Sequence, residues 1–212
     1  MKQGRAREWT LTHNSRFEKS KFTIVCFSRR RTPDPLQPGK TTPEPLPDFV
    51  YKGVSIKPQH NHKFLGMHFE QELRWDIQAE RVTAKATKWI LLFRRLSKPS
   101  TGVHTTFMRR LYRAVAIPKI TYAADIWFTP LTRKEGQKRL TGSVGVARKL
   151  SSLQHLATIA ITGAMKTTAT EVLEVHADIQ PVDILLNDIC HRAGAWYFVY
   201  TNGCSIAMFS IL

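Results

Sequence analysis

The clearest pattern of apolar and polar positions lies between residues 75 and 96. Apolar side chains recur there at spacings of four and three, which is the spacing of one face of an α-helix. They are Trp75, Ala79, Val82, Ala86, Trp89, Phe93 and Leu96. The same spacing predicts a second helix over residues 103–116, and residues 120–128 predict a third. In the second helix, Phe107, Leu111 and Ala114 should face inward.

Helical spacing continues toward the C-terminus. Residues 146–161 predict a long helix, and Gly163 should end it because glycine readily adopts the left-handed conformation of a helix end. Its expected inward residues are Leu150, Leu153, Ala157 and Ile161. Shorter helices are expected over residues 170–175 and after Pro181. The polar stretch 129–145, which contains glycine and lysine, is expected to be a loop.

The first 70 residues follow a different pattern. Residues 21–28, KFTIVCFS, are rich in β-branched and aromatic side chains and predict a strand. Residues 51–56 predict a second strand, and residues 63–69, KFLGMHF, a third that contains a glycine. Residues 29–49 hold six prolines, which exclude a helix and a central strand. We therefore expect an extended surface loop there.

The charge of the chain points to its partners. The 212 residues carry a formal net charge of +16, with a pI near 10.2. Residues 1–120 hold 24 Lys and Arg against 9 Asp and Glu, whereas residues 121–212 hold 8 against 7. A positive field of this size concentrates polyanions, and phosphate backbones are the commonest of these. We therefore expect a nucleic-acid partner, bound mainly by the first half of the chain.

The cysteines and histidines give little sign of special chemistry. The three cysteines form no CxxC pair and no even-numbered framework, which suits a reducing compartment. The N-terminus has no apolar segment of the secretory kind, so we expect an intracellular protein of the nucleus or cytoplasm. His60, His62 and His68 lie close together in sequence. No cysteine or carboxylate completes a ligand spacing with them, so we expect no metal site.

Four stretches, in this order, resemble the C-terminal part of reverse transcriptases of the LINE type, the enzymes of non-LTR retrotransposons. They are FEKSKFTIVCFSRRR at 17–31, KFLGMHFEQELRW at 63–75, MRRLYRAVAIPKITYAADIWF at 108–128 and ITGAMKTTATEVLEVHADIQPVDILL at 161–186. Together they cover most of residues 10–195. The combination of KFLG with a following basic helix is the most specific part of this resemblance.

The resemblance implies how the chain would hold nucleic acid. KFLGM resembles the primer-grip hairpin, formed here by Lys63, Phe64, Leu65 and Gly66, where glycine allows a close approach of backbones. The helices that follow would be the thumb, which holds a template–primer duplex by its phosphates. Its expected phosphate contacts are Arg74, Arg81, Lys85, Lys88, Arg109, Arg110 and Arg113. The alternative is that these cations are an ordinary solvated helix face.

On this basis we expect an α+β fold in which a small antiparallel β segment is followed by a helical, thumb-like bundle. Residues 1–70 would be part of a palm, with the proline-rich loop 29–49 and the primer-grip hairpin. Residues 71–195 would be the thumb. The apolar tail 196–212 departs from the family and is expected to be a divergent end. A buried helix or strand and a membrane anchor are its alternatives.

The resemblance also places a candidate catalytic residue. Lys21 matches the lysine of motif D, which is thought to protonate the departing pyrophosphate as a general acid; the alternative is a solvent-facing lysine at the start of a strand. The complete family enzyme uses Mg²⁺ held by aspartates, including a YxDD turn. No aspartate precedes Lys21 here, and no Asp-Asp pair occurs. Asp125, in YAAD, follows the hairpin within a helical pattern, so we expect no catalytic role for it.

These observations favour a catalytically incomplete portion of an RNA-directed DNA polymerase. It would bind an RNA–DNA or DNA duplex, hold no cofactor itself, and depend for synthesis on an upstream polymerase portion if one is present. The alternative is a basic nucleic-acid-binding module without catalysis. A thumb should prefer a primer–template hybrid to single strands, and a module that recognises flexible RNA should show the reverse preference. No membrane partner is favoured.

Overall fold

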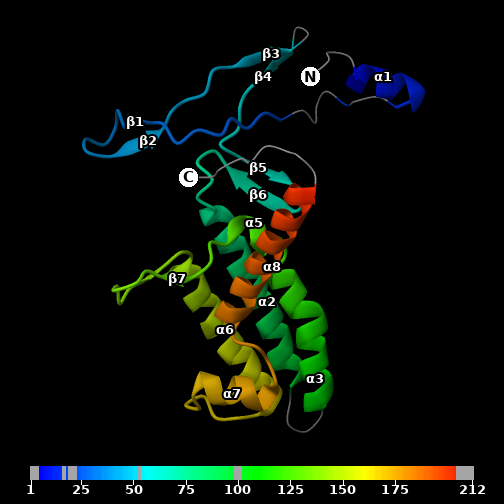
Figure 1. Ribbon diagram of the computed structural model, residues 1–212, viewed down its shortest axis with the longest axis vertical. Coiled ribbons are helices and arrows are strands. Elements are labelled where there is room, and N and C mark those ends of the chain that lie inside the picture. Colours follow the sequence, from blue (N-terminus) through cyan, green and yellow to red (C-terminus); the bar gives the residue numbers. More distant parts are fainter. Residues whose placement is uncertain (1–4, 16–17, 19–22, 52–53, 98–101, 204–212) are drawn as a thin grey trace. The chain divides into compact units, whose positions relative to one another are not determined.

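The computed structural model describes residues 5–15, 18, 23–51, 54–97 and 102–203. The predicted α+β class is confirmed, since helices occur with four two-stranded antiparallel sheets (Figure 1). The chain divides into two compact units, Met1–Arg74 and Trp75–Leu212. The division falls four residues beyond the boundary expected after residue 70.

The first unit contains one helix and three β-hairpins. Its elements are α1 (Arg5–Thr12), β1 (Arg31–Pro33), β2 (Thr41–Pro43), β3 (Phe49–Tyr51), β4 (Val54–Ile56), β5 (Asn61–Phe64) and β6 (Met67–Glu70). Each strand pairs with its sequence neighbour: β1 with β2, β3 with β4, and β5 with β6. A two-stranded ribbon leaves its outer edges free, so the ribbon within the proline-rich loop can accommodate Pro33 and Pro43 at its end.

The strand expected over residues 21–28 is wrong for its described part. Residues 23–28 form no strand, and their backbone makes isolated contacts instead. The Ser28 amide donates to the Gln71 carbonyl at 3.0 Å, and the Gln59 amide donates to the Ile24 carbonyl at 2.9 Å. β-branched composition favoured an extended chain, but a strand also needs a continuous ladder of hydrogen bonds with one neighbour.

The KFLGMHF segment is a hairpin and not one continuous strand. Phe64 on β5 pairs with Met67 on β6, so the loop between them is Leu65-Gly66. Both loop residues have positive φ, 48° and 84°, as a two-residue type I′ turn requires. The glycine therefore lies in the turn, and its role is to allow a left-handed backbone. The single strand expected over residues 51–56 is likewise divided: Tyr51 ends β3, and Val54–Ile56 form β4.

The second unit is a helical bundle with one short hairpin. Its elements are α2 (Asp76–Leu96), α3 (Thr105–Leu111), the π-helical turn η2 (Tyr112–Ala116), α4 (Ile117–Ile120), α5 (Ala124–Trp127), β7 (Thr132–Arg133), β8 (Leu140–Thr141), α6 (Val144–Thr162), α7 (Thr170–Ala177) and α8 (Val182–Gly203). Helix α2 packs along α6, and α8 packs against α5 and α6 (Figure 1). The short hairpin β7–β8 lies within the stretch 129–145 that was expected to be a loop.

The two longest predicted apolar faces are confirmed. On α2, Val82, Ala86 and Phe93 are buried, and Ile90 joins them. On α6, the buried residues include Leu150, Ala157 and Ile161. Gly163 ends α6 with φ 72°, as predicted. The helix predicted over residues 170–175 is α7, and Pro181 immediately precedes α8.

The inward face predicted for residues 103–116 is wrong. Phe107 is 59% exposed and Ala114 is exposed, whereas Met108, Tyr112 and Ala116 are buried. Apolar residues occur in both rows, so spacing could not decide between them. In the π-helical turn η2 a hydrogen bond spans five residues, as from the Ile117 amide to the Tyr112 carbonyl. This wider turn brings residues four apart, Tyr112 and Ala116, onto the same buried side.

The helix expected over residues 120–128 is interrupted. Ile120 ends α4 and residues 124–127 form α5, because Ala123 adopts a left-handed conformation with φ 53° and separates the two. Asp125 is exposed on this one-turn helix. The YAAD segment therefore lies in a helical turn and not in a hairpin between strands, as predicted.

A buried polar network joins three helical elements. The Tyr112 hydroxyl donates to Oε1 of Gln154 at 3.2 Å. Nε2 of Gln154 donates to Oε1 of Glu174 at 2.7 Å and to the Gln180 carbonyl at 3.0 Å. Burial raises the pKa of both the Tyr112 hydroxyl and the Glu174 carboxyl. These bonds fix η2, α6 and α7 relative to one another inside the bundle.

The apolar tail begins on α8. Trp196, Tyr197, Phe198 and Tyr200 are each more than half exposed, so the buried alternative is wrong for these four residues. The rings of Trp196 and Tyr200 stack at 5.3 Å. Residues 204–212 lie outside the described residues. Among the helices described, none combines the length and apolar character that crossing a membrane requires.

Candidate nucleic-acid interface

Three of the predicted phosphate contacts share one face of α2. Arg81, Lys85 and Lys88 are exposed and lie four and three residues apart, so they project from neighbouring turns on the same side. None of the three forms an ion pair within the part of the chain that the structure describes. An acidic residue on a helix can pair with a basic residue three or four positions later. Glu80 has Thr83 and Ala84 at these positions, so neither provides a positive charge. We call these three residues the α2 cationic face.

A fourth cation reaches this region from α4. Nζ of Lys119 lies 4.5 Å from the centre of the Trp89 ring, which is a cation–π contact. Trp89 follows Lys88 in sequence and lies one turn beyond Lys85. Lys119 is therefore held beside the α2 cationic face, and it is exposed. The sequence could not indicate this residue, because the contact joins positions 30 residues apart on different helices.

The arginines of α3 and η2 form a separate group. Arg109 and Arg113 both approach Oδ2 of Asp178, at 3.6 and 3.0 Å, and Asp178 follows the last residue of α7. Arg110 lies over the Phe107 ring at 5.9 Å. One carboxylate shared by two guanidiniums leaves a surplus of positive charge. Exposed ion pairs of this kind are weak, so a phosphate can compete for either arginine.

Arg74 belongs to the first unit and is ion-paired there. Its Nε lies 2.8 Å from Oε2 of Glu72, and Nε of Arg31 lies 2.7 Å from Oε1 of the same carboxylate. The Glu72 side chain is only 9% exposed, so this carboxylate is bound closely by both arginines. Arg74 is thus less available to a phosphate than the α2 cationic face.

The four residues predicted as a primer grip lie at the tip and edge of the β5–β6 hairpin. Lys63 and Phe64 end β5, and Leu65 and Gly66 form the turn. Phe64 and Leu65 are 60% and 75% exposed, so the tip presents apolar surface. The ring of Phe64 packs edge-on against Phe69 at 6.3 Å, which supports the hairpin from one side.

The predicted general acid, Lys21, lies outside the described residues. Among the described residues, no group of three or more His, Cys, Asp or Glu side chains could hold a metal ion. His60, one of the histidines of the first unit, bonds through Nδ1 to Oε1 of Gln71 at 2.8 Å.

Comparison with protein-family models, with curated proteins and with solved structures gives no match for this chain. The interface described above therefore has to be interpreted from its own geometry and charge.

Proposed function

We propose that this chain is a thumb-like portion of a LINE-type reverse transcriptase, which binds a template–primer duplex and has no polymerase activity of its own. The observation that carries this proposal is the α2 cationic face, with three exposed cations on one side of a helix and a fourth beside them. The resemblance of the sequence supplies the kind of nucleic acid. The interface residues themselves supply only the preference for phosphate.

The dimensions of this face suit a phosphate backbone. Arg81 and Lys88 are seven residues apart, which is roughly 10 Å along a helix axis. One strand of a duplex carries a charge about every 3.4 Å along its axis. Because the strand winds around that axis, consecutive phosphates are farther apart along the strand itself, so three cations over this length would face about two or three phosphates. Contacts of this kind position a duplex without recognising its sequence.

The other predicted residues have supporting roles in this proposal. Arg109, Arg110 and Arg113 would exchange their present contacts for phosphates. Lys63, Phe64, Leu65 and Gly66 would contact the primer end. In a complete enzyme Lys21 would act as the general acid and Mg²⁺ would be bound by aspartates of an upstream portion. Within these 212 residues no Asp-Asp pair exists, so the proposed role is binding and not synthesis.

Replacement of the α2 cationic face tests the proposal. The variant Arg81→Ala/Lys85→Ala/Lys88→Ala should bind an RNA–DNA hybrid more weakly whatever the sequence. The slope of log affinity against log salt concentration should become shallower by about one unit per lost contact. Fluorescence anisotropy at several salt concentrations measures both effects. Arg94→Ala is a matched control, because Arg94 is also exposed on α2 but lies on a different face.

The two candidate functions differ in ligand preference. A thumb-like portion should bind the hybrid more tightly than either strand alone, through duplex shape and backbone contacts. A basic module that recognises flexible RNA should prefer the single strand. A preference for the single strand would favour the basic module over the thumb-like portion. A salt slope unchanged in the triple variant would mean that these residues are an ordinary solvated face.

A further inference from the structure

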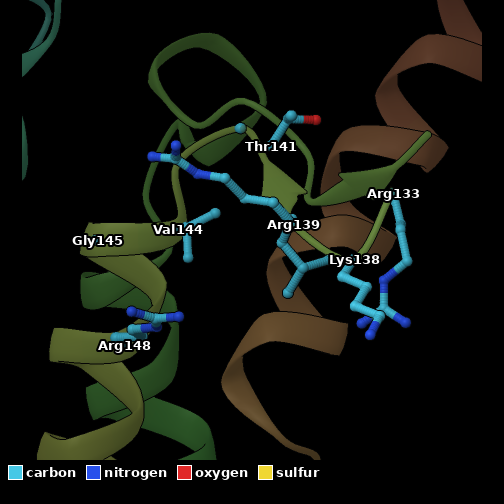
Figure 2. Close-up of a pocket in the computed structure, with 9 residues that line it drawn as sticks. Arg133, Lys138, Arg139, Thr141, Val144, Gly145 and Arg148 are labelled. Carbon is cyan, nitrogen blue, oxygen red and sulfur yellow. The ribbon is translucent and has the colours of Figure 1, made fainter. Parts of the chain in front are cut away.

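The second unit contains a cationic pocket that lies away from the α2 cationic face. Hairpin β7–β8 and the start of α6 enclose a volume of about 880 Å³. Four cations line it: Arg133, Lys138, Arg139 and Arg148. Figure 2 shows Arg133 and Lys138 projecting together from the hairpin, while Arg148 comes from α6. No carboxylate is among the lining residues. We call this volume the hairpin pocket.

The hairpin that carries these cations is fixed at its base. The Ser143 amide donates to the Thr129 carbonyl at 3.1 Å, and the Thr129 amide donates to Oγ of Ser143 at 3.0 Å. Asn187 of α8 accepts from the Leu131 amide at 2.8 Å. Both ends of the hairpin are thus attached to helices of the bundle. A ligand of the hairpin pocket would thus meet a backbone that is already held at its base, which lowers the entropic cost of ordering the hairpin on binding.

Most of the positive charge in the hairpin pocket is not balanced. Glu135 lies in the hairpin turn but does not line the pocket. Arg148 also lines a neighbouring pocket that contains Glu171, Glu174 and Asp183, so its charge is partly offset. Arg133, Lys138 and Arg139 have no such neighbours among the lining residues. None of the four cations forms an ion pair with any residue that the structure describes. In Figure 2 the Arg139 side chain extends away from Arg133 and Lys138, so the unbalanced charges surround the pocket instead of meeting at one point. Unbalanced positive charge of this kind favours an anionic ligand.

We infer that the hairpin pocket binds the phosphates of a single-stranded segment of nucleic acid. It would be a second site, in addition to the proposed duplex contact on α2. A single backbone can enter a concave pocket of this size, whereas a duplex presents its phosphates on a broad convex surface and would meet only the rim. Leu140 and Val144 offer apolar contact, and no aromatic ring lines the pocket. Without stacking on a ring, little base preference is expected. The choice of nucleic acid as ligand rests on the proposed function.

The test compares two probes on the full chain: a blunt RNA–DNA hybrid, and the same hybrid with a single-stranded extension. The wild-type chain should bind the extended hybrid more tightly. In Lys138→Ala/Arg139→Ala this gain should fall about tenfold, with the affinity for the blunt hybrid nearly unchanged, since about two phosphate contacts are lost. Lys134→Ala is the matched control, because Lys134 lies in the same hairpin, is exposed, and does not line the pocket. Equal melting temperatures would show that all variants are folded.

Three outcomes would overturn the inference. An equal loss of this gain in Lys134→Ala would mean that the total positive charge of the hairpin, and not the pocket, causes the tighter binding of the extended hybrid. An equal loss on blunt and extended hybrids would mean that the pocket contacts the duplex. Pocket-dependent binding of pyrophosphate, with no effect of the variants on the extended hybrid, would assign the pocket to a free phosphate compound.

The α2 triple variant separates this inference from the proposed function. It should weaken both hybrids equally and leave the gain from the extension intact. If that variant binds normally while Lys138→Ala/Arg139→Ala loses the gain, the duplex proposal fails and the hairpin pocket stands. If the triple variant weakens both hybrids but the pocket variant keeps the full gain, the pocket inference fails alone.

Discussion

Glu174 is a carboxyl group in the middle of the helical bundle, where it accepts a hydrogen bond from Gln154. Burial raises its pKa above the ordinary value of 4.5, and the nearby carboxylates Asp183 and Glu171 raise it further. The hydrogen bond from Gln154 and the proximity of His155 act in the opposite direction. The folded chain therefore holds a proton on Glu174 that the unfolded chain releases at a lower pH.

This pKa shift predicts a pH-dependent stability. Because the folded pKa is raised, the unfolding free energy should fall as pH rises from the unfolded pKa through the folded pKa. Glu174→Gln removes the charge and keeps an oxygen that can accept from Gln154. We expect the variant to melt at a higher temperature than the wild type by a few degrees at about pH 7, and at nearly the same temperature at about pH 4. Thermal unfolding followed by circular dichroism at both pH values measures this.

Glu171→Gln is the matched control, because Glu171 is on the same helix but exposed. Its difference in melting temperature from the wild type should change much less with pH, because Glu174 is retained. A Glu174→Gln variant that shifts the melting temperature equally at both pH values would show that packing, and not ionisation, explains the change.

The contacts of single residues were hard to predict from the sequence. Arg74 was expected to contact phosphate, but it pairs with Glu72, only two positions away. The contact of Lys119 with Trp89 joins different helices, and so does the bond from Tyr112 to Gln154, which lies 42 positions away. Spacing along the chain carries no information about such contacts. The burial of Met108 in place of Phe107 is a related case, because the helix has two apolar rows and the choice depends on what packs against it.

At the scale of elements, α2, α6 and the hairpin at KFLGM were predicted, whereas the full length of α8 and the shorter ribbons were not. The faces of α2 and α6 follow from a repeat that extends over about five turns, so the pattern is unambiguous. Strands β7 and β8 have two residues each, which is too short for any alternation to appear. The charge count over residues 121–212 also concealed the hairpin pocket. Six of the eight cations there lie close together in sequence; they are Arg133, Lys134, Lys138, Arg139, Arg148 and Lys149.

The β7–β8 hairpin should depend on one glycine. Gly142 has φ 95°, and a Cβ there would overlap with the carbonyl oxygen of Pro130. Gly142→Ala should therefore displace the base of the hairpin and cost more than about 1 kcal/mol in unfolding free energy. Gly136→Ala is the control, since Gly136 also has positive φ but no atom lies within 4 Å of its added Cβ. Urea denaturation of both variants measures the difference, and equal costs would mean that the close approach to Pro130 is unimportant.

At the scale of the whole molecule, each of the two units carries candidate contacts of its own. The β5–β6 hairpin belongs to Met1–Arg74, and the α2 cationic face and the hairpin pocket belong to Trp75–Leu212. The sequence could indicate this division, because the strand-like and helical patterns change near the same position. It could not indicate how many separate cationic sites the second unit carries, since charges distant in sequence are gathered by packing.

Polymerisation is a property of a whole enzyme, and here its requirements are incompletely met. Transfer of a nucleotide by LINE-type reverse transcriptases depends on aspartates that hold two metal ions beside the primer end. These 212 residues contain cationic surface but no Asp-Asp pair, and no aspartate before Asp34. We therefore expect no template-dependent product when the purified chain is incubated with an RNA–DNA primer–template, Mg²⁺ and dNTPs. Primer extension resolved on a denaturing gel measures this directly.

The same assay can show that the chain is bound while it is inactive. Added to an active reverse transcriptase, it should lower the yield by occupying the primer–template, and an excess of hybrid should restore the yield. The α2 triple variant should inhibit less at the same concentration, because fewer phosphates are neutralised. Product formed by the chain alone, in a preparation shown to be free of other polymerases, would contradict the prediction. Inhibition that excess hybrid does not relieve would mean that the chain acts on the enzyme and not on its substrate.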